Sequence, residues 1–172
     1  IMPDSVTDIG TNPAFVNCTG LKELRLSDNL AKFNSNSLNG CTNLEKVNIP
    51  ACWTEIPSGM FFGCVGLKEL TIPGNIQVIP NGLLKGCRGL ETVTIESGVE
   101  VIGNEAFSGC KNLENIEFTK ELKIIGNNAF EGTDIRYITF QKKLEHIGKE
   151  AFKDCKLGVI IIPSTVTTIG NG

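Results

Sequence analysis

Residues 95–116 read IESGVEVIGNEAFSGCKNLENI, and most of the chain consists of variants of this stretch. The cysteine near its middle, with a turn-forming residue before it, recurs every 23 residues, at Cys18, Cys41, Cys64, Cys87 and Cys110. Thr133 takes the next place in the series, and Cys155 follows 22 residues later. The chain therefore contains a repeat of 22–23 residues along nearly its whole length.

Apolar positions recur in step with the cysteine. A leucine or isoleucine follows it by two or three residues and opens the pattern L-x-x-[L/V/I]-x-[I/L/F], as in Leu90, Val93 and Ile95. Further apolar columns lie nine and twelve residues after that leucine. A unit of this size cannot bury its own apolar side chains, so the columns predict ladders inside a stack of coils. The alternating part of the pattern predicts one parallel strand per repeat, and residues 103–108 fit a single helical turn better than a strand.

Both ends of the chain fall within the repeat. Residues 1–10 match residues 162–170, the second half of a repeat, and neither end carries a polar capping unit. We expect one solenoid domain over residues 1–172, with about seven repeats, open at both ends and taken from a longer array.

The unit I-P-x-x-V-x-x-I-G-x-x-A-F-x-G-C-x-x-L-x-x-V closely resembles the BspA-like, or treponemal-type, class of leucine-rich repeats. The clearest copies are residues 72–90 and 95–116. The resemblance implies a right-handed solenoid with short helical or 3-10 turns opposite the strands. It also implies an extracellular or cell-surface protein that adheres to host matrix proteins or to other cells, with no catalytic residues. Thr133, and the prolines Pro57 and Pro80 in place of the glycine of I-G, depart from the motif.

The composition excludes several classes of function. The net charge is −3 and the chain has no basic block, so nucleic acid is not an expected partner. No run of 18 apolar residues exists, so this segment is not expected to insert into a membrane. Acidic residues lack metal-loop spacing, and the lone histidine, His146, precedes a core position. We expect no metal, no cofactor and no enzymatic activity.

The cysteine column admits two interpretations. Stacked coils would bring successive cysteines to roughly 5 Å, within disulfide range. However, ladder side chains point the same way, and no CxxC pair or nearby histidine suggests zinc. The sequence therefore favours buried, free thiols. Cys52 lies outside the column, and we expect it to be exposed and to be the one reactive thiol.

The candidate binding site is the concave face of the predicted sheet. Its outward positions flank the middle apolar residue of each strand. They are mixed in charge at first and turn apolar at the far end. The apolar residues there either contact a partner or merely cover the sheet or meet a further C-terminal part of the protein. The outward positions are Glu23, Arg25, Lys46, Asn48, Glu69, Thr71, Thr92, Thr94, Asn115, Glu117, Tyr137, Thr139, Val159 and Ile161.

The sequence thus predicts a non-enzymatic module that binds a protein or a glycan, the protein being host extracellular matrix or another cell surface. Two alternatives stay open. The repeats could be a rigid spacer, or an appendage of a larger surface protein or enzyme whose activity lies elsewhere in the parent chain.

Overall fold

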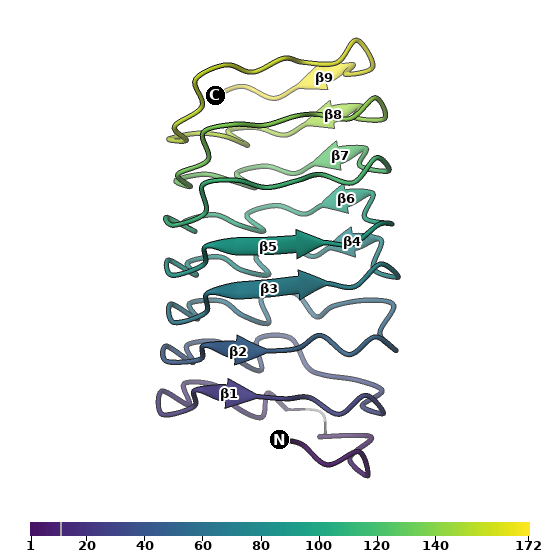
Figure 1. Cartoon of the computed structure of the whole chain (residues 1–172), viewed down its shortest axis with the longest axis vertical. Coiled ribbons are helices and arrows are strands. Elements are labelled where there is room, and N and C mark those ends of the chain that lie inside the picture. The colour runs from purple at the N-terminus through teal and green to yellow at the C-terminus, as the bar shows by residue number, and fades with distance from the viewer. Residues whose placement is uncertain (11) are drawn as a thin grey trace.

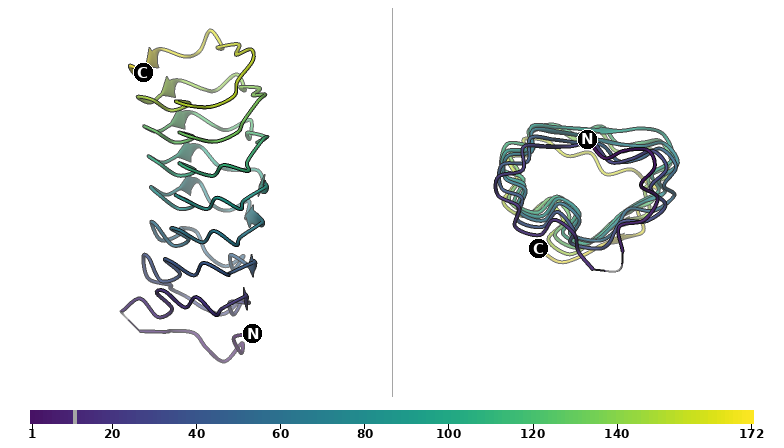
Figure 2. Two further views of the ribbon diagram at one scale, coloured as in Figure 1. Left: turned by 90° about the vertical axis from the view of Figure 1, so that its left-hand side faces the viewer. Right: turned by 90° about the horizontal axis from the view of Figure 1, so that it is seen from below.

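The computed structural model describes residues 1–10 and 12–172. The chain winds into a single column of stacked coils (Figure 1), and the coils nearly superimpose when viewed along the column (Figure 2). We number the coils from the recurring leucine as residues 21–43, 44–66, 67–89, 90–112, 113–134, 135–156 and 157–172. The predicted solenoid is confirmed.

The repeated apolar columns form the core of the column of coils. Leu44, Leu67, Leu90, Leu113 and Ile135, from five successive coils, are all fully buried. The phenylalanine column stacks ring on ring in the last coils, with the centroids of Phe107 and Phe130 5.0 Å apart and those of Phe130 and Phe152 5.4 Å apart. Each coil therefore buries its apolar side chains against its neighbours, as a short repeat must.

Parallel strands lie on two sides of the column, whereas the sequence predicted strands on one side only. Coils 3 and 4 carry a strand on both sides. The leucine side carries the strands of the L-x-x-L-x-L pattern, and the isoleucine side carries a second series twelve residues after the leucine. The leucine side holds β1 (Glu23–Leu24), β2 (Lys46–Val47), β3 (Glu69–Ile72) and β5 (Thr92–Ile95). The isoleucine side holds β4 (Val78–Ile79), β6 (Val101–Ile102), β7 (Ile124–Ile125), β8 (His146–Ile147) and β9 (Thr168–Ile169).

The isoleucine side is the more regular of the two. Its strands form one sheet in the order β4-β6-β7-β8-β9, in register along the isoleucine column. The leucine side is divided into the pairs β1-β2 and β3-β5, and single bridges join Asn115 to Tyr137 and Tyr137 to Val159. Strands of two residues are too short to leave an alternating pattern, which is why the sequence did not predict the second series.

The third side of each coil, the turn side, consists of consecutive turns and not of the expected helical turn. Within the described residues the chain forms no helix, and so none that could cross a membrane. Glu105 has φ 55°, outside the helical region. The amides of Glu105 and Phe107 donate to Asn127 O and Ala129 O of the next coil, each at 2.8 Å. These inter-coil bonds occupy donors that a helix would turn back on its own chain.

Replacing Phe107 by alanine should lower the free energy of unfolding by about 3–5 kcal/mol. The ring is fully buried, and its removal leaves a cavity beside Phe130. Urea denaturation followed by circular dichroism measures the change. Thr94→Ala, on the exposed surface of β5, is the control and should change stability by less than about 0.5 kcal/mol. A near-neutral Phe107→Ala would contradict the ladder of buried rings.

Removing either of two buried hydroxyls should change the free energy of unfolding, in opposite directions for the two. Ser37 is fully buried and its Oγ has no hydrogen-bond partner, whereas Ala106 and Ala129 hold the same position in later coils. Thr133 Oγ1 donates to Phe130 O at 2.9 Å. Ser37→Ala should therefore raise the free energy of unfolding by about 1 kcal/mol, and Thr133→Val should lower it by a similar amount. The same denaturation assay checks both, and a loss of stability in Ser37→Ala would contradict the first expectation.

Candidate functional site

The candidate site is the outward surface of the leucine side, which we call the leucine face. All fourteen positions predicted from the sequence lie on this side, in the strands, the bridges or directly beside them. Thirteen of the fourteen are exposed, and Asn48 is half-buried. The coils nearly superimpose end-on (Figure 2), so the face runs close to straight along the column and is not the concave surface that the sequence suggested.

Asn48 is a structural residue and not a free polar group of the face. Its Oδ1 accepts a hydrogen bond from the amide of Leu26 at 2.7 Å, and its Nδ2 donates to Leu26 O at 3.2 Å. The side-chain amide thereby replaces the backbone pairing that stops after β2. Both polar groups of the Asn48 side chain are hydrogen-bonded within the solenoid, so Asn48 is not expected to bind a partner.

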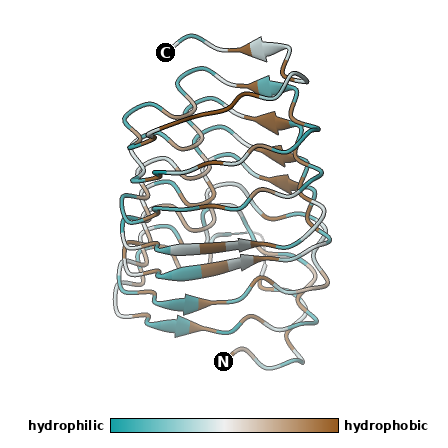
Figure 3. Cartoon of the chain, turned by 45° about the horizontal axis from the view of Figure 1, so that its top comes forward, coloured by the Kyte–Doolittle hydropathy of each residue, from teal (hydrophilic) through white to brown (hydrophobic). Residues whose placement is uncertain are grey.

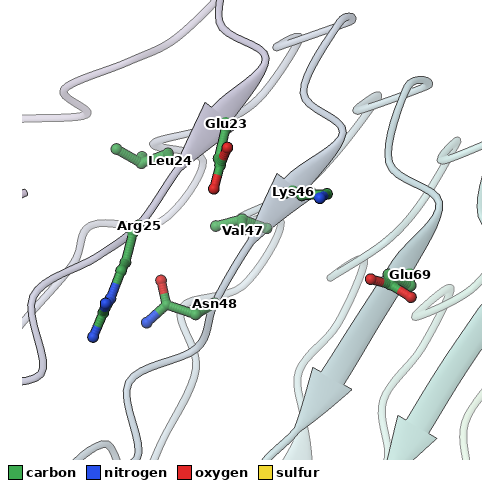
Figure 4. Close-up of a pocket in the computed structure, with 7 residues that line it drawn as sticks. All are labelled: Glu23, Leu24, Arg25, Lys46, Val47, Asn48 and Glu69. Carbon is green, nitrogen blue, oxygen red and sulfur yellow. The ribbon is translucent and has the colours of Figure 1, made fainter. Parts of the chain in front are cut away.

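The N-terminal half of the face is charged. Glu23, Lys46 and Glu69 follow one another on three successive coils and alternate in sign. Figure 4 shows them around a shallow hollow of about 230 Å³, whose floor is formed by Leu24 and Val47. Among the described residues none of the three charged groups lies within 4.0 Å of an oppositely charged group, so all three remain available to a partner.

The C-terminal half of the face contains an apolar patch. Tyr137, Val159 and Ile161 have exposed fractions of 74%, 76% and 78%. A parallel bridge holds Tyr137 beside Val159. Figure 3 shows a long, strongly hydrophobic stretch in the upper coils, in agreement with the four successive apolar residues at 159–162. Three large apolar side chains so fully exposed on an ordered surface are typical of a contact site.

Ion pairs border the apolar patch. Arg136 contacts Glu114 at 3.1 Å, and Lys156 contacts Asp134 at 2.5 Å. Each pair joins successive coils next to Tyr137. All four side chains are at least 30% exposed, so the pairs add little to stability. They place polar groups at the edge of the apolar patch beside Tyr137, as at the rim of many protein interfaces.

Comparison with protein families gives a match to the BspA type leucine rich repeat region over residues 1–114 and 100–172. The chain belongs to the BspA-type leucine-rich-repeat family. Repeats of this kind are scaffolds for protein interaction, and the fold is typically non-catalytic. A search among functionally characterised proteins gave no match.

Solved structures of leucine-rich repeat proteins show the same fold. A leucine-rich repeat protein of T. pallidum has a TM-score of 0.73 and 24% identity, over 88% of this chain and 71% of its own. One from Eubacterium ventriosum has a TM-score of 0.64 and 19% identity, over 94% of this chain and 49% of its own. A leucine rich cell surface protein of Faecalibacterium prausnitzii has a TM-score of 0.53 and 23% identity, over 97% of this chain and 67% of its own. The chain thus spans about half the length of the Eubacterium protein.

The cysteine column of this BspA-type chain packs into the turn side. Cys41, Cys64, Cys87 and Cys110 are buried, whereas Cys18 and Cys155 are only half-buried because they lie toward the ends. Each buried thiol donates to a carbonyl of the preceding coil, as Cys87 does to Phe61 O at 3.0 Å. All seven cysteines are free, and the described residues contain no cluster of three metal-binding side chains. Cys52 is exposed as predicted, and its reactivity stays a prediction.

Burial makes these thiols hard to ionise. It raises the pKa of Cys64 and of Cys110 to about 12, and that of Cys87 well above its ordinary value. The neighbouring carbonyls accept hydrogen bonds from the neutral thiol only. The buried cysteines of the column therefore pack in the core and each donate one hydrogen bond, and their thiols are poor nucleophiles at neutral pH.

The raised pKa values predict a loss of stability in alkali. Unfolded thiols lose their protons above their ordinary pKa of 9.0, whereas Cys64 and Cys110 keep theirs up to about pH 12. The unfolded state therefore binds fewer protons over this range, and the free energy of unfolding falls as the pH rises from about 9 to about 12. Urea denaturation across this range measures the slope. Cys110→Ala should show a shallower fall, and an identical slope would contradict the assignment.

Proposed function

We propose that this chain is a non-catalytic binding module that contacts a partner protein through the apolar end of its leucine face. The observation that carries the proposal is the exposure of Tyr137, Val159 and Ile161 on adjacent coils. Exposed aromatic and aliphatic side chains in a polar rim are the usual centre of a protein interface. The charged hollow around Lys46 then supplies specificity at the other end of the face.

Energetics support a contact at this end. An aromatic side chain buries about 150–250 Å² at an interface, and apolar burial contributes about 25 cal/mol per Å². Covering Tyr137 therefore contributes favourably to binding, and the costs of association reduce this contribution. The backbone beneath it is already fixed by bridges to Asn115 and Val159, so little ordering cost opposes binding.

A protein suits this patch better than a glycan. Val159 and Ile161 offer no hydrogen-bonding groups, and the neighbouring charges Arg136 and Lys156 are already paired. The implied adhesion of BspA-like repeats makes host extracellular matrix or another cell surface the expected source of the partner. An extracellular or cell-surface location is supported by the name of the Faecalibacterium neighbour, a leucine rich cell surface protein.

A rigid spacer is the second candidate function. Backbone hydrogen bonds between successive coils, such as Glu91 N to Lys68 O at 2.9 Å and Gly103 N to Ile79 O at 2.8 Å, support it. A spacer needs only a stiff column, so its role would not depend on the identity of residues on the leucine face. The two functions therefore differ in their response to face substitutions.

The double variant Tyr137→Asp, Ile161→Asp should lose binding to immobilised extracellular-matrix proteins or to whole cells, because two charges replace the apolar contact. Surface plasmon resonance and cell-adhesion assays measure the loss, and circular dichroism verifies the fold. Ile124→Asp is the matched control, since Ile124 is an exposed apolar residue (38%) on the isoleucine side. It should leave binding unchanged.

Unchanged adhesion by the double variant would favour the spacer over the binding face. An equal loss in Ile124→Asp would show that general surface hydrophobicity, and not the leucine face, carries the contact.

A further inference from the structure

Three lines of backbone hydrogen bonds join successive coils, one on each side. The junction between coils 3 and 4 has all three. On the leucine side Glu91 N donates to Lys68 O at 2.9 Å, and on the isoleucine side Gly103 N donates to Ile79 O at 2.8 Å. On the turn side Gly86 N donates to Ser108 O at 2.8 Å.

The junction between coils 2 and 3 keeps only the turn-side line. There Gly59 N donates to Asn81 O at 3.2 Å, and the bonds Phe61 N to Leu83 O and Gly63 N to Lys85 O follow at 3.0 and 2.9 Å. In the part of the chain that the structure describes, no backbone hydrogen bond joins β2 to β3, and none joins residues 53–57 to residues 76–80.

No other junction between coils 1 and 7 lacks both strand ladders among the described residues. Coils 1 and 2 are joined by the pairing of β1 with β2. Coils 4 and 5 lack pairing on the leucine side but keep β6 paired with β7. Coils 5, 6 and 7 are joined by bridges on the leucine side and by β7, β8 and β9 on the other.

A proline accounts for one of the bonds missing on the isoleucine side. In coils 4 to 7 the residue after the isoleucine is a glycine whose amide donates to the coil before, as Gly126 N does to Ile102 O at 2.8 Å. Pro80 occupies this position in coil 3 and has no N–H, so Ile56 O loses its donor. The Asn75 side chain bonds instead to Ala51 O at 2.9 Å and to Trp53 O, but these contacts lie before the isoleucine column.

We propose that this junction is a hinge, about which coils 1 and 2 rock against coils 3 to 7. The continuous turn-side bonds between residues 59–63 and 81–85 form the axis. The other two sides are held by apolar packing of buried residues such as Leu44, Leu67 and Ile76, which is not directional and tolerates small openings.

The hinge divides the leucine face into an adaptable half and a rigid half. The hollow of Figure 4 crosses the junction, because Leu24 and Val47 lie in coils 1 and 2 and Glu69 lies in coil 3. Rocking changes the separation of Lys46 and Glu69, and with it the width of the hollow. Tyr137 and Val159 lie where both ladders persist, so their spacing stays fixed.

Pulsed electron–electron double resonance, which measures the distribution of distances between two nitroxide labels, tests the hinge in a Cys52→Ser background. One pair, Arg25→Cys with Glu117→Cys, spans the junction. The matched pair, Thr71→Cys with Ile161→Cys, spans the same number of coils, roughly 19 Å, without crossing it. We expect a broader distance distribution for the first pair. Equal widths would overturn the hinge.

Pro80→Gly supplies the second measurement, because it restores an amide opposite Ile56 O. It should narrow the distribution of the pair that spans the junction and leave the matched pair unchanged. The amide that the substitution creates at residue 80 should exchange as slowly as the amide of Gly103. An unchanged width would overturn the assignment of the proline as the cause.

Discussion

The structure depends on one constraint, the transfer of backbone hydrogen bonds from each coil to the next. A coil of 22–23 residues has no helix or hairpin of its own in which to pair its N–H and C=O groups. It also cannot bury its own apolar columns. Both needs are met at the same place, because neighbours that pair in register bring Leu90 over Leu67 and Phe130 over Phe107. The repeat length is therefore held nearly constant by the pairing itself.

The same pairing orders the surface. Once the inward positions of a strand are fixed by the core, the residues between them must face outward. Register then lines up these outward residues from coil to coil, so Glu23, Lys46 and Glu69 become a row of alternating charges and Tyr137 and Val159 become neighbours. A binding surface built in this way needs no loop insertions. It can change along its length by single substitutions, which leave the core columns untouched.

Places where the backbone pairing between coils is interrupted also affect the leucine face. Asn48 turns its side-chain amide to the backbone of Leu26 where β2 ends, and Pro80 withdraws a donor from the isoleucine side. The bonds of Asn48 join coils 1 and 2, whereas Pro80 lies at the junction of coils 2 and 3. The charged half of the leucine face therefore rests on the least connected part of the column, and the apolar patch on a fully connected part. A partner that touches both halves would meet an adaptable surface and a preorganised one.

The sequence by itself determined the repeat, the buried columns, the family and the outward positions of the leucine face. These depend on periodicity, which stacked coils impose on every copy. Only the tertiary structure decided the second series of strands, the turns that replace the expected helical turn, the role of Asn48 and the straightness of the face. Each of these depends on hydrogen bonds between residues about 22–26 positions apart, as between Cys87 and Phe61. Such bonds leave no local pattern in the sequence. The residues of a two-residue strand, or a residue with a positive φ such as Glu105, cannot be told from their neighbours by sequence alone.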